Sequence, residues 1–389
     1  MAARLGRLTA VRALGAALLV GSVLAVPVGT GVAMVPALPP VNILAFRGQG
    51  ELAFMWNGRP YLLDGTHARL VALPANGQVS RLAWSPDCRW LAYLDAGSVD
   101  RLWLVPAAGG AAHRVGGLPA RLGDYQWLGS GATLVVSGPA VPGRVAAWLV
   151  TPAGKPRRLA LPGPYGLISP DGDRVAWTTL IPAADPLKRS ETLAAARIGG
   201  APARQLYAPS AGIWLTSWWP DSRGLLYFID PQFANSLADD GLTLYSLPLG
   251  GRPKALTTLL TWGDWRVPSP SGRELLLVAG IDRVVWHNKY LMICAIETGA
   301  CHALPRQRGT VAIDPAWSPA GNRIAFVRAR DLGLNGCCVK PVLAPWLAGR
   351  TLWVADRRGL GAHRITAAGH GVSDPQWSGD GHHLLFWRE

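Results

Sequence analysis

The chain has 389 residues, a mass of 41.4 kDa and a mean hydropathy of +0.18, so it is long enough to bury a sizeable core. Its 49% of hydrophobic residues exclude an intrinsically disordered chain, and its five cysteines are too few for a small disulfide-stapled scaffold. The net charge is +14, but basic residues form no run longer than the pairs at 157–158 and 357–358. Because the positive charge is dispersed, we expect no nucleic-acid partner.

The first 40 residues predict export. Residues 1–12 carry Arg4, Arg7 and Arg12 and no acid, and residues 13–46 are uncharged. A basic start followed by an apolar stretch is typical of a secretory signal, and this stretch is also long enough to span a bilayer. Residues 1–40 are therefore expected to be a cleaved signal peptide or an uncleaved membrane anchor. The rest of the chain should lie outside the cytoplasm, in an extracellular, periplasmic or outward-facing anchored form.

One pattern recurs seven times in the remainder. An apolar residue precedes Ser-Pro-Asp-Gly or a decayed copy of it, and a strand-forming run follows. The copies begin at Trp84, Trp127, Ile168, Trp218, Pro268, Trp317 and Trp377. Each reads as a β-hairpin, because Pro and Gly suit a tight turn, and a second hairpin with a Gly-containing turn follows most of them. Four antiparallel strands per repeat are typical of a propeller blade.

We therefore predict an all-β fold, with residues 41–389 forming a single β-propeller of seven four-stranded blades. Six or eight blades are the alternatives. The last copy has no second hairpin after it, whereas residues 59–73 supply one near the start. Strands from both termini are thus expected to close the ring, which removes open sheet edges. Residues 51–56 compete with residues 382–387 for the closing blade. The repeated tryptophans are expected to be core.

The runs WSPDCRWLAYLD from Trp84 and WSPAGNRIAFVRA from Trp317 resemble the WD40-like (PD40) repeats of TolB-type periplasmic β-propellers. The resemblance covers about residues 50–389, and it implies the propeller fold. The chain departs from TolB itself, because that protein carries an additional N-terminal α/β domain and six blades. This chain leaves no room for such a domain and shows seven motif copies, so the partners of TolB are not carried over.

Long insertions fall on one face of the predicted propeller. We call it the loop-rich face, and it contains the connections between the second and third strands of each blade and between successive blades. The insertions are residues 181–192, 230–240, 281–289 and 328–350. Loops on a rigid scaffold commonly carry function. Trp286 and Trp346 lie within them and are expected to anchor a ligand, because Trp often dominates binding energy.

The same face should receive the residue three positions before each motif copy, with an error of one position. These residues are expected to ring the mouth of the central channel, and they are Arg81, Asp124, Tyr165, Leu215, Trp265, Asp314 and Asp374. The three carboxylates suit a cation or a basic ligand. Alternatively, Asp314 and Asp374, each followed by Pro, cap the turn that enters the inner strand.

The cysteines suit an exported protein. Cys294 and Cys301 flank a turn in facing strands and are candidates for a disulfide, and the adjacent Cys337 and Cys338 are further candidates. An odd number leaves at least one thiol free or paired with another chain. The alternative is that all five are unpaired small residues.

The motifs of common enzymes are missing from the sequence. It contains no G-x-S-x-G, H-E-x-x-H or C-x-x-C. We therefore expect no catalytic residues, metal or cofactor, and predict a monomeric, non-catalytic extracytoplasmic scaffold. Its partner would be a protein or an anionic cell-envelope polymer, with a membrane contacted only through residues 1–40. The alternative is a propeller enzyme of the metal-assisted polysaccharide lyase or lactonase type, acting at the channel.

Overall fold

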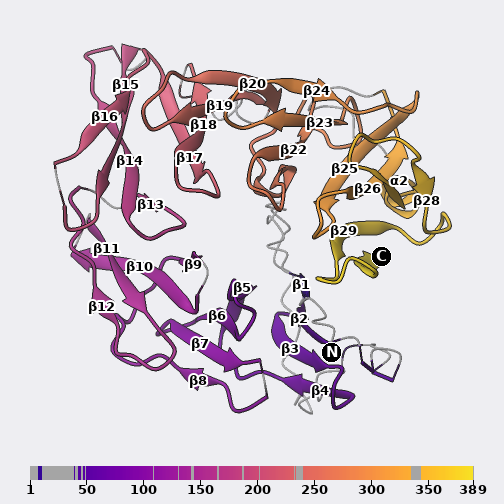
Figure 1. The fold of residues 1–389 in the computed structure, drawn as a ribbon, viewed down its shortest axis with the longest axis horizontal. Helices are drawn as coiled ribbons and strands as arrows, with labels where there is room; N and C mark the ends of the chain where they lie inside the picture. Colours follow the sequence, from indigo (N-terminus) through magenta and orange to yellow (C-terminus); the bar gives the residue numbers. More distant parts are fainter. Residues whose placement is uncertain are drawn as a thin grey trace, which may run out of the picture.

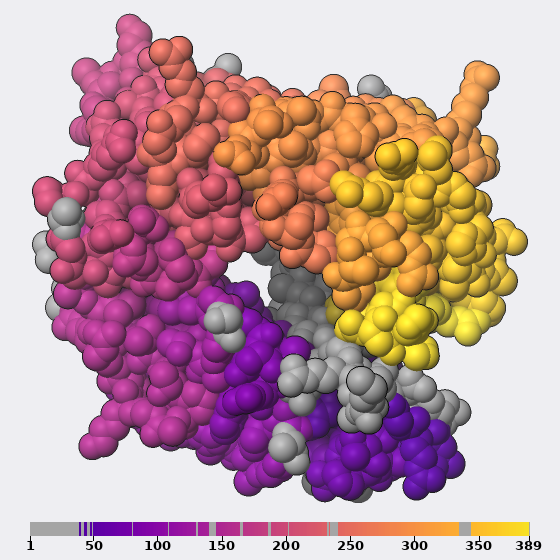
Figure 2. All heavy atoms as spheres, in the orientation of Figure 1, coloured from indigo at the N-terminus to yellow at the C-terminus, as the bar shows by residue number. Residues whose placement is uncertain are grey.

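The computed structural model describes residues 8–10, 39, 43–44, 47–48, 50–107, 109–129, 131–141, 144–163, 166–185, 188–200, 202–231, 233, 240–333 and 343–388. Small sheets follow one another around a central opening, and this ring is a seven-bladed β-propeller (Figures 1 and 2). The all-β prediction and the blade count are therefore confirmed. Helix is confined to short pieces such as η2 (Gly263–Trp265) and α2 (Leu343–Ala348).

Blades 1 to 6 are four-stranded antiparallel sheets whose strands follow chain order from the channel outward. Their strands are β5 (Gln78–Trp84), β6 (Trp90–Ala96), β7 (Arg101–Pro106) and β8 (His113–Arg114); β9 (Tyr125–Leu128), β10 (Thr133–Val141), β11 (Arg144–Val150) and β12 (Arg157–Arg158); β13 (Leu167–Ile168), β14 (Arg174–Ile181), β15 (Ser190–Arg197) and β16 (Arg204–Tyr207); β17 (Gly212–Trp218), β18 (Gly224–Asp230), β19 (Leu242–Pro248) and β20 (Lys254–Leu259); β21 (Arg266–Pro268), β22 (Glu274–Ala279), β23 (Tyr290–Ala295) and β24 (Cys301–Ala303); and β25 (Thr310–Trp317), β26 (Arg323–Arg330), β27 (Thr351–Asp356) and β28 (His363–Arg364).

Blade 7 is assembled from both ends of the chain. The N-terminal part is a sheet in the order β1-β2-β3-β4, and the C-terminal part is the hairpin β29-β30. These strands are β1 (Leu8–Ala10), β2 (Glu51–Trp56), β3 (Arg59–Asp64), β4 (Arg69–Ala72), β29 (Val372–Trp377) and β30 (Leu384–Arg388). In Figure 1 the two parts are neighbours in the ring, at the indigo and yellow ends of the chain.

The closure differs in detail from a shared four-stranded sheet. Among the described strands, β30 pairs with β29, whereas β2 pairs with β3 and, in parallel, with β1. Residues 51–56 and 382–387, the two candidates for the closing blade, thus belong to separate sheets. The parts meet through side chains instead, because Leu385 and Trp387 pack against the apolar cluster of β2 and β3. That cluster consists of Leu52, Phe54, Tyr61 and Leu63.

Where the turn begins with Ser, its own side chains hold the inner hairpin together. In blade 3 the Ser169 hydroxyl donates to Asp171 Oδ1, and the Ser169 carbonyl accepts from the amide of Gly172 at 2.8 Å. The Arg174 amide then donates back to Ser169 Oγ at 2.9 Å. Gly172 has a φ of 74°, which favours a residue without Cβ. Ser85 and Ser378 repeat the serine contacts in blades 1 and 7.

The motif tryptophans connect successive blades. The indole Nε1 of four of them donates to a backbone carbonyl on the inner strand of the preceding blade. The pairs are Trp127 to Ala83 at 2.9 Å, Trp218 to Leu167 at 2.8 Å, Trp317 to Val267 at 3.2 Å and Trp377 to Ala316 at 3.3 Å. The rings also pack in the clusters between blades. They are thus core residues, as predicted, and each adds a directional bond across a blade junction.

Cys294 and Cys301 form a disulfide between β23 and β24. Cys88 has an unbonded thiol and is exposed. Cys337 and Cys338 lie outside the described residues, as does most of the predicted leader at 1–40. Within the described part of the chain, the helices are all too short or too polar to cross a bilayer.

Candidate functional site

Among the described residues, most of the exposed large apolar side chains lie on the loop-rich face. Six of them, between 44% and 52% exposed, lie on strand ends or loops at this end of blades 2 to 5. They are Val145, Leu180, Ile181, Trp214, Trp262 and Ile281. Scattered exposed apolar residues are normal, but their concentration at one end of a propeller is not required by folding.

Arg81 and Asp124, from blades 1 and 2, pair across the blade junction. Arg81 Nη1 lies 3.0 Å from both carboxylate oxygens of Asp124, and it also donates to the carbonyl of Tyr125 at 2.9 Å. The Arg81 guanidinium lies 5.2 Å from the centroid of the Tyr125 ring. Both charged side chains are more than 40% exposed, so the ion pair is well hydrated and contributes little stability. Asp124 is thereby held by Arg81 rather than joining the other predicted carboxylates.

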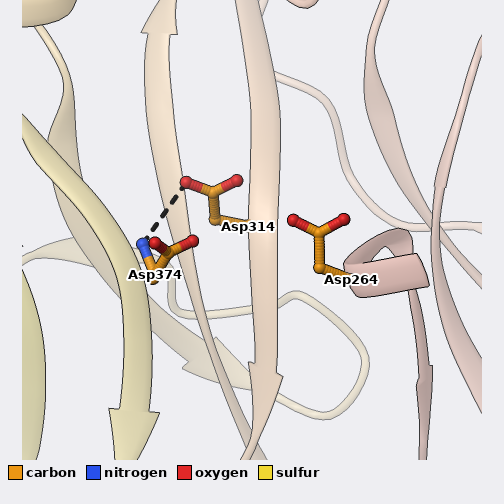
Figure 3. A group of neighbouring side chains, drawn as sticks. All are labelled: Asp264, Asp314 and Asp374. Carbon is orange, nitrogen blue, oxygen red and sulfur yellow. Dashed lines mark hydrogen bonds between the residues drawn. The ribbon is translucent and has the colours of Figure 1, made fainter. Parts of the chain in front are cut away.

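Asp314 and Asp374 come together at the other side of the ring, and Asp264 joins them (Figure 3). One carboxylate oxygen from each residue lies within 4.8 Å of the other two. Asp314 is buried, Asp374 is half-buried and Asp264 is exposed. The Asp374 amide also donates to Asp314 Oδ2 at 3.4 Å, so Asp314 caps the inner strand of the next blade. We call these three residues the carboxylate cluster.

A repeated backbone feature places two members of the cluster. Asp314 and Asp374 have φ values of 48° and 49°, in the left-handed region that Asp tolerates better than most residues. Each lies at a break in the pairing register of its hairpin, between Ile313 and Ala316 or between Ser373 and Gln376. A bulge of this kind re-aims a side chain. The Asp-Pro sequence thus places two carboxylates where they converge, and Asp314 accepts from the Asp374 amide.

The rule of three positions before each motif copy predicts Trp265 at the channel mouth and misses Asp264. The short helix η2 shifts the register by one position, so Asp264 is exposed while Trp265 is only 1% exposed and packs in the core. Trp265 is therefore no channel-mouth residue. The allowance of one position was the only signal for Asp264 in the sequence. Tyr165 lies outside the described residues.

The insertion at 281–289 is fixed to the blade by Lys289. Its Nζ donates to the carbonyls of Ile281, Asp282 and His287 at 2.7, 2.9 and 3.0 Å, which uses all three ammonium protons. The side chain is only 1% exposed. Burial lowers the pKa of Lys289 to about 8, although the nearby carboxylates of Asp282 and Asp331 favour its charged form. This insertion is therefore a structured loop.

His287 connects this loop to the next blade. Its Nδ1 lies 2.7 Å from Asp331 Oδ1, and its Nε2 lies 3.9 Å from Asp282 Oδ2. The Asp331 carboxylate also accepts from the amides of Asn288 and Gly333. Burial raises the pKa of Asp331, but the bonds from His287 and these amides outweigh it and hold that pKa below its usual value. His287 thus joins two insertions in a bridge between blades.

Trp286 and Trp346 contact each other on the loop-rich face, with ring centroids 6.4 Å apart and planes at 71°. Trp346 is only 6% exposed, and its Nε1 donates to the carbonyl of Arg330 at 2.9 Å. Trp286 is half-buried against the same core. This placement gives Trp346 a packing role within its own insertion. The exposed aromatic rings of this face are instead Trp214 and Trp262, which the sequence analysis did not single out.

No protein-family model matches the sequence, and the search of curated proteins gives no match. The search of solved structures gives propellers. TolB from Acinetobacter baumannii is 15% identical over 83% of this chain and 81% of its own, with a TM-score of 0.40. Oligogalacturonate lyase from Vibrio parahaemolyticus is 11% identical over 78% and 84%, with a TM-score of 0.49. A prolyl endopeptidase is 11% identical over 80% of this chain, with a TM-score of 0.50, and this chain spans 49% of its length.

These solved structures include both a TolB and enzymes, so the fold they share does not select one activity. At such identities a likeness shows the fold alone. The chain is thus a seven-bladed β-propeller whose solved structural neighbours include TolB.

Proposed function

We propose that this protein is a non-catalytic extracytoplasmic scaffold that binds a protein ligand through its loop-rich face. Export is part of the proposal and rests on the basic and apolar pattern of residues 1–40. The observation that carries the binding role is the exposure of Trp214 and Trp262, 48% and 46% respectively, at the same end of neighbouring blades. Exposed tryptophan is costly in water and frequently anchors protein interfaces.

The surroundings of the two rings favour a ligand with apolar and basic groups. Ile281 is exposed on the adjoining insertion, and the carboxylate cluster lies on the following blades. A cluster of carboxylates attracts basic side chains and repels an anionic polymer. A protein ligand with basic residues therefore fits this face better than an anionic cell-envelope polymer does. The bridges made by His287 and Lys289 keep the insertions in place for binding.

The test is capture of partners by the exported domain, followed by substitution of the two exposed rings. Photo-crosslinking groups placed beside Trp214 and Trp262 should capture a protein from the organism's cell envelope. Trp214→Ala or Trp262→Ala should then weaken binding of the identified partner by more than about 1 kcal/mol. The melting temperature should change little, because both rings are about half exposed.

Leu360 provides the matched control. It is 53% exposed, but it lies in a turn at the opposite end of blade 6. Leu360→Ala should leave the affinity unchanged. Binding that survives both Trp substitutions but is lost with Leu360→Ala would show that the interface lies at the end of the propeller opposite the loop-rich face. Binding of purified anionic cell-envelope polymer, without any protein partner, would replace the protein ligand with the polymer.

The second candidate is a metal-assisted enzyme that acts at the channel, and the carboxylate cluster favours it. Carboxylate oxygens are preferred by Ca²⁺ and Mn²⁺, and Asp264, Asp314 and Asp374 bring three together. Titration of Ca²⁺ or Mn²⁺ into the purified protein should show saturable binding if this candidate holds. Asp314→Asn should abolish it, whereas Asp124→Asn, which affects only the exposed pair with Arg81, should not. Protein that binds neither metal removes the candidate.

A further inference from the structure

A small cavity at the junction of blades 5 and 6 is lined by cations without a carboxylate. Its volume is about 20 Å³, which is room for one water molecule or one small ion. The polar side chains that line it are Lys289, Tyr290, Arg306, Gln307, Thr310 and Arg328, and no acidic side chain of the described residues lines it. The cavity lies beside the insertions of the loop-rich face, and no residue of the carboxylate cluster lines it.

Arg328 is the buried charge at this cavity. It is only 9% exposed, and its guanidinium lies 4.1 Å from the Trp353 ring centroid and 5.2 Å from that of Phe326. Its guanidinium donates from Nη1 to Gln307 Oε1 at 2.7 Å, which is a neutral acceptor. Its Nε is buried and has no hydrogen-bond partner among the described residues. A guanidinium buried between two rings without a counter-charge is costly to fold.

The other cations at the cavity add positive potential, and they bring no hydrogen-bond acceptor that would compete with an anion for Arg328. Arg306 lies over the Tyr290 ring at 4.1 Å and is exposed at the mouth of the cavity. The three protons of Lys289 already go to backbone carbonyls, so it supplies charge rather than a donor. The Thr310 hydroxyl donates to the Gln307 carbonyl at 2.8 Å. The carboxylates of Asp282 and Asp331 act on Lys289 but do not line the cavity.

We propose that this cavity is a small-anion site in which Arg328 and Arg306 bind one negatively charged group. The volume limits that group to a halide ion or the end of a carboxylate. A bound anion would compensate the buried charge of the Arg328 guanidinium, which lines the cavity. The site is separate from the exposed tryptophans, so it can hold whether or not the proposed function does.

The test compares anions of different size on the full chain at constant ionic strength. The purified protein is placed in sodium isethionate, whose anion is too large for the cavity, and chloride, formate or sulfate replaces it stepwise. Chloride or formate should raise the melting temperature saturably by a few degrees, on the order expected for a ligand well above its dissociation constant. The melting temperature in sulfate should be no higher than in isethionate. A response to chloride alone identifies a free ion, and a response to formate alone identifies the carboxylate of a larger ligand.

Two variants and a control decide the location. Arg328→Met keeps the contacts with the rings and should lose the anion response, while Arg306→Gln at the mouth should weaken it several-fold. Arg308→Gln removes an exposed charge from the same loop outside the cavity and should retain the response. Should Arg328→Met fail to fold, the anion response of Arg306→Gln and the anomalous signal of bromide in crystals still test whether the anion binds in this cavity. A water molecule in the cavity at high bromide, or an anion response of undiminished affinity in Arg306→Gln, would overturn the proposal.

Discussion

The indole of Trp127 donates from Nε1 to the carbonyl of Ala83 at 2.9 Å, across the junction between blades 1 and 2. The same bond recurs from Trp218, Trp317 and Trp377. Each such bond satisfies a backbone acceptor on an inner strand that faces a neighbouring sheet. The repeated tryptophan therefore fixes the angle between blades as well as filling space, which apolar packing alone would leave less defined.

Removing this bond should destabilise the ring measurably. Trp127→Phe keeps an aromatic ring but leaves the Ala83 carbonyl without its donor, so we expect the free energy of unfolding to fall by about 1–3 kcal/mol. Urea denaturation measures it. Trp103→Phe is the matched control, because the Trp103 Nε1 is buried without a hydrogen-bond partner among the described residues. That variant should lose only the packing of the larger ring. Equal losses in the two variants would show that the bond contributes nothing.

The terminal hairpin should be needed for the closed ring. Deletion of residues 379–389 removes β30 and with it Leu385 and Trp387, which cover the apolar cluster of the N-terminal sheet. We expect aggregation or loss of a single cooperative unfolding transition, because each blade depends on its neighbours. Light scattering and calorimetry measure the two outcomes. A truncated protein that melts like the full chain would show that the ring closes without this hairpin.

The disulfide should contribute to stability outside the cytoplasm. Cys294 and Cys301 are seven residues apart, and a loop this short gives about 2–3 kcal/mol in the chain-entropy estimate. Addition of a reductant should therefore lower the melting temperature of the protein. Cys294→Ala combined with Cys301→Ala should melt at the lower temperature with or without reductant. If reductant lowers the melting temperature of the double variant as well, another bond is responsible.

Lys289 should hold the insertion at 281–288. Lys289→Met removes the donor of three partly buried hydrogen bonds, so we expect a loss of about 2–4 kcal/mol and faster amide exchange in that insertion. Lys254→Met is the control, because the Lys254 Nζ makes one exposed hydrogen bond to the Glu297 carbonyl. It should cost less than about 1 kcal/mol. Unchanged exchange at residues 281–288 in Lys289→Met would show that other contacts hold the loop.

The leader prediction is tested separately from the fold. Residues 1–50 fused to a reporter that is active only outside the cytoplasm should give signal, and glutamate at positions 4, 7 and 12 should reduce it. The arginines orient the segment, so reversing their charge opposes export. A reporter that is active only in the cytoplasm, fused to the same residues, should stay silent. Signal from that second reporter would contradict export.

The sequence predicts the fold well because the fold is a repeat. Seven copies of one turn and strand pattern specify seven hairpins. The tryptophan that begins a copy, such as Trp84 or Trp317, packs against the core for the same reason. The site is harder, because it depends on departures from the repeat. Asp264 reaches the carboxylate cluster because the short helix η2 shifts the register by one position, and this shift has no periodic signal. Arg81 and Asp124 occupy equivalent positions of their repeats, but the repeat pattern does not indicate that their side chains pair with each other.

The split closure of blade 7 has a consequence for how the chain is made. Leu52 and Phe54 emerge during synthesis well before Leu385 and Trp387, which cover them. The apolar face of the N-terminal sheet therefore stays uncovered until β30 has been synthesised. The ring cannot close before that point. A chain that stalls or is cut short leaves that face uncovered, where chaperones and proteases can recognise it.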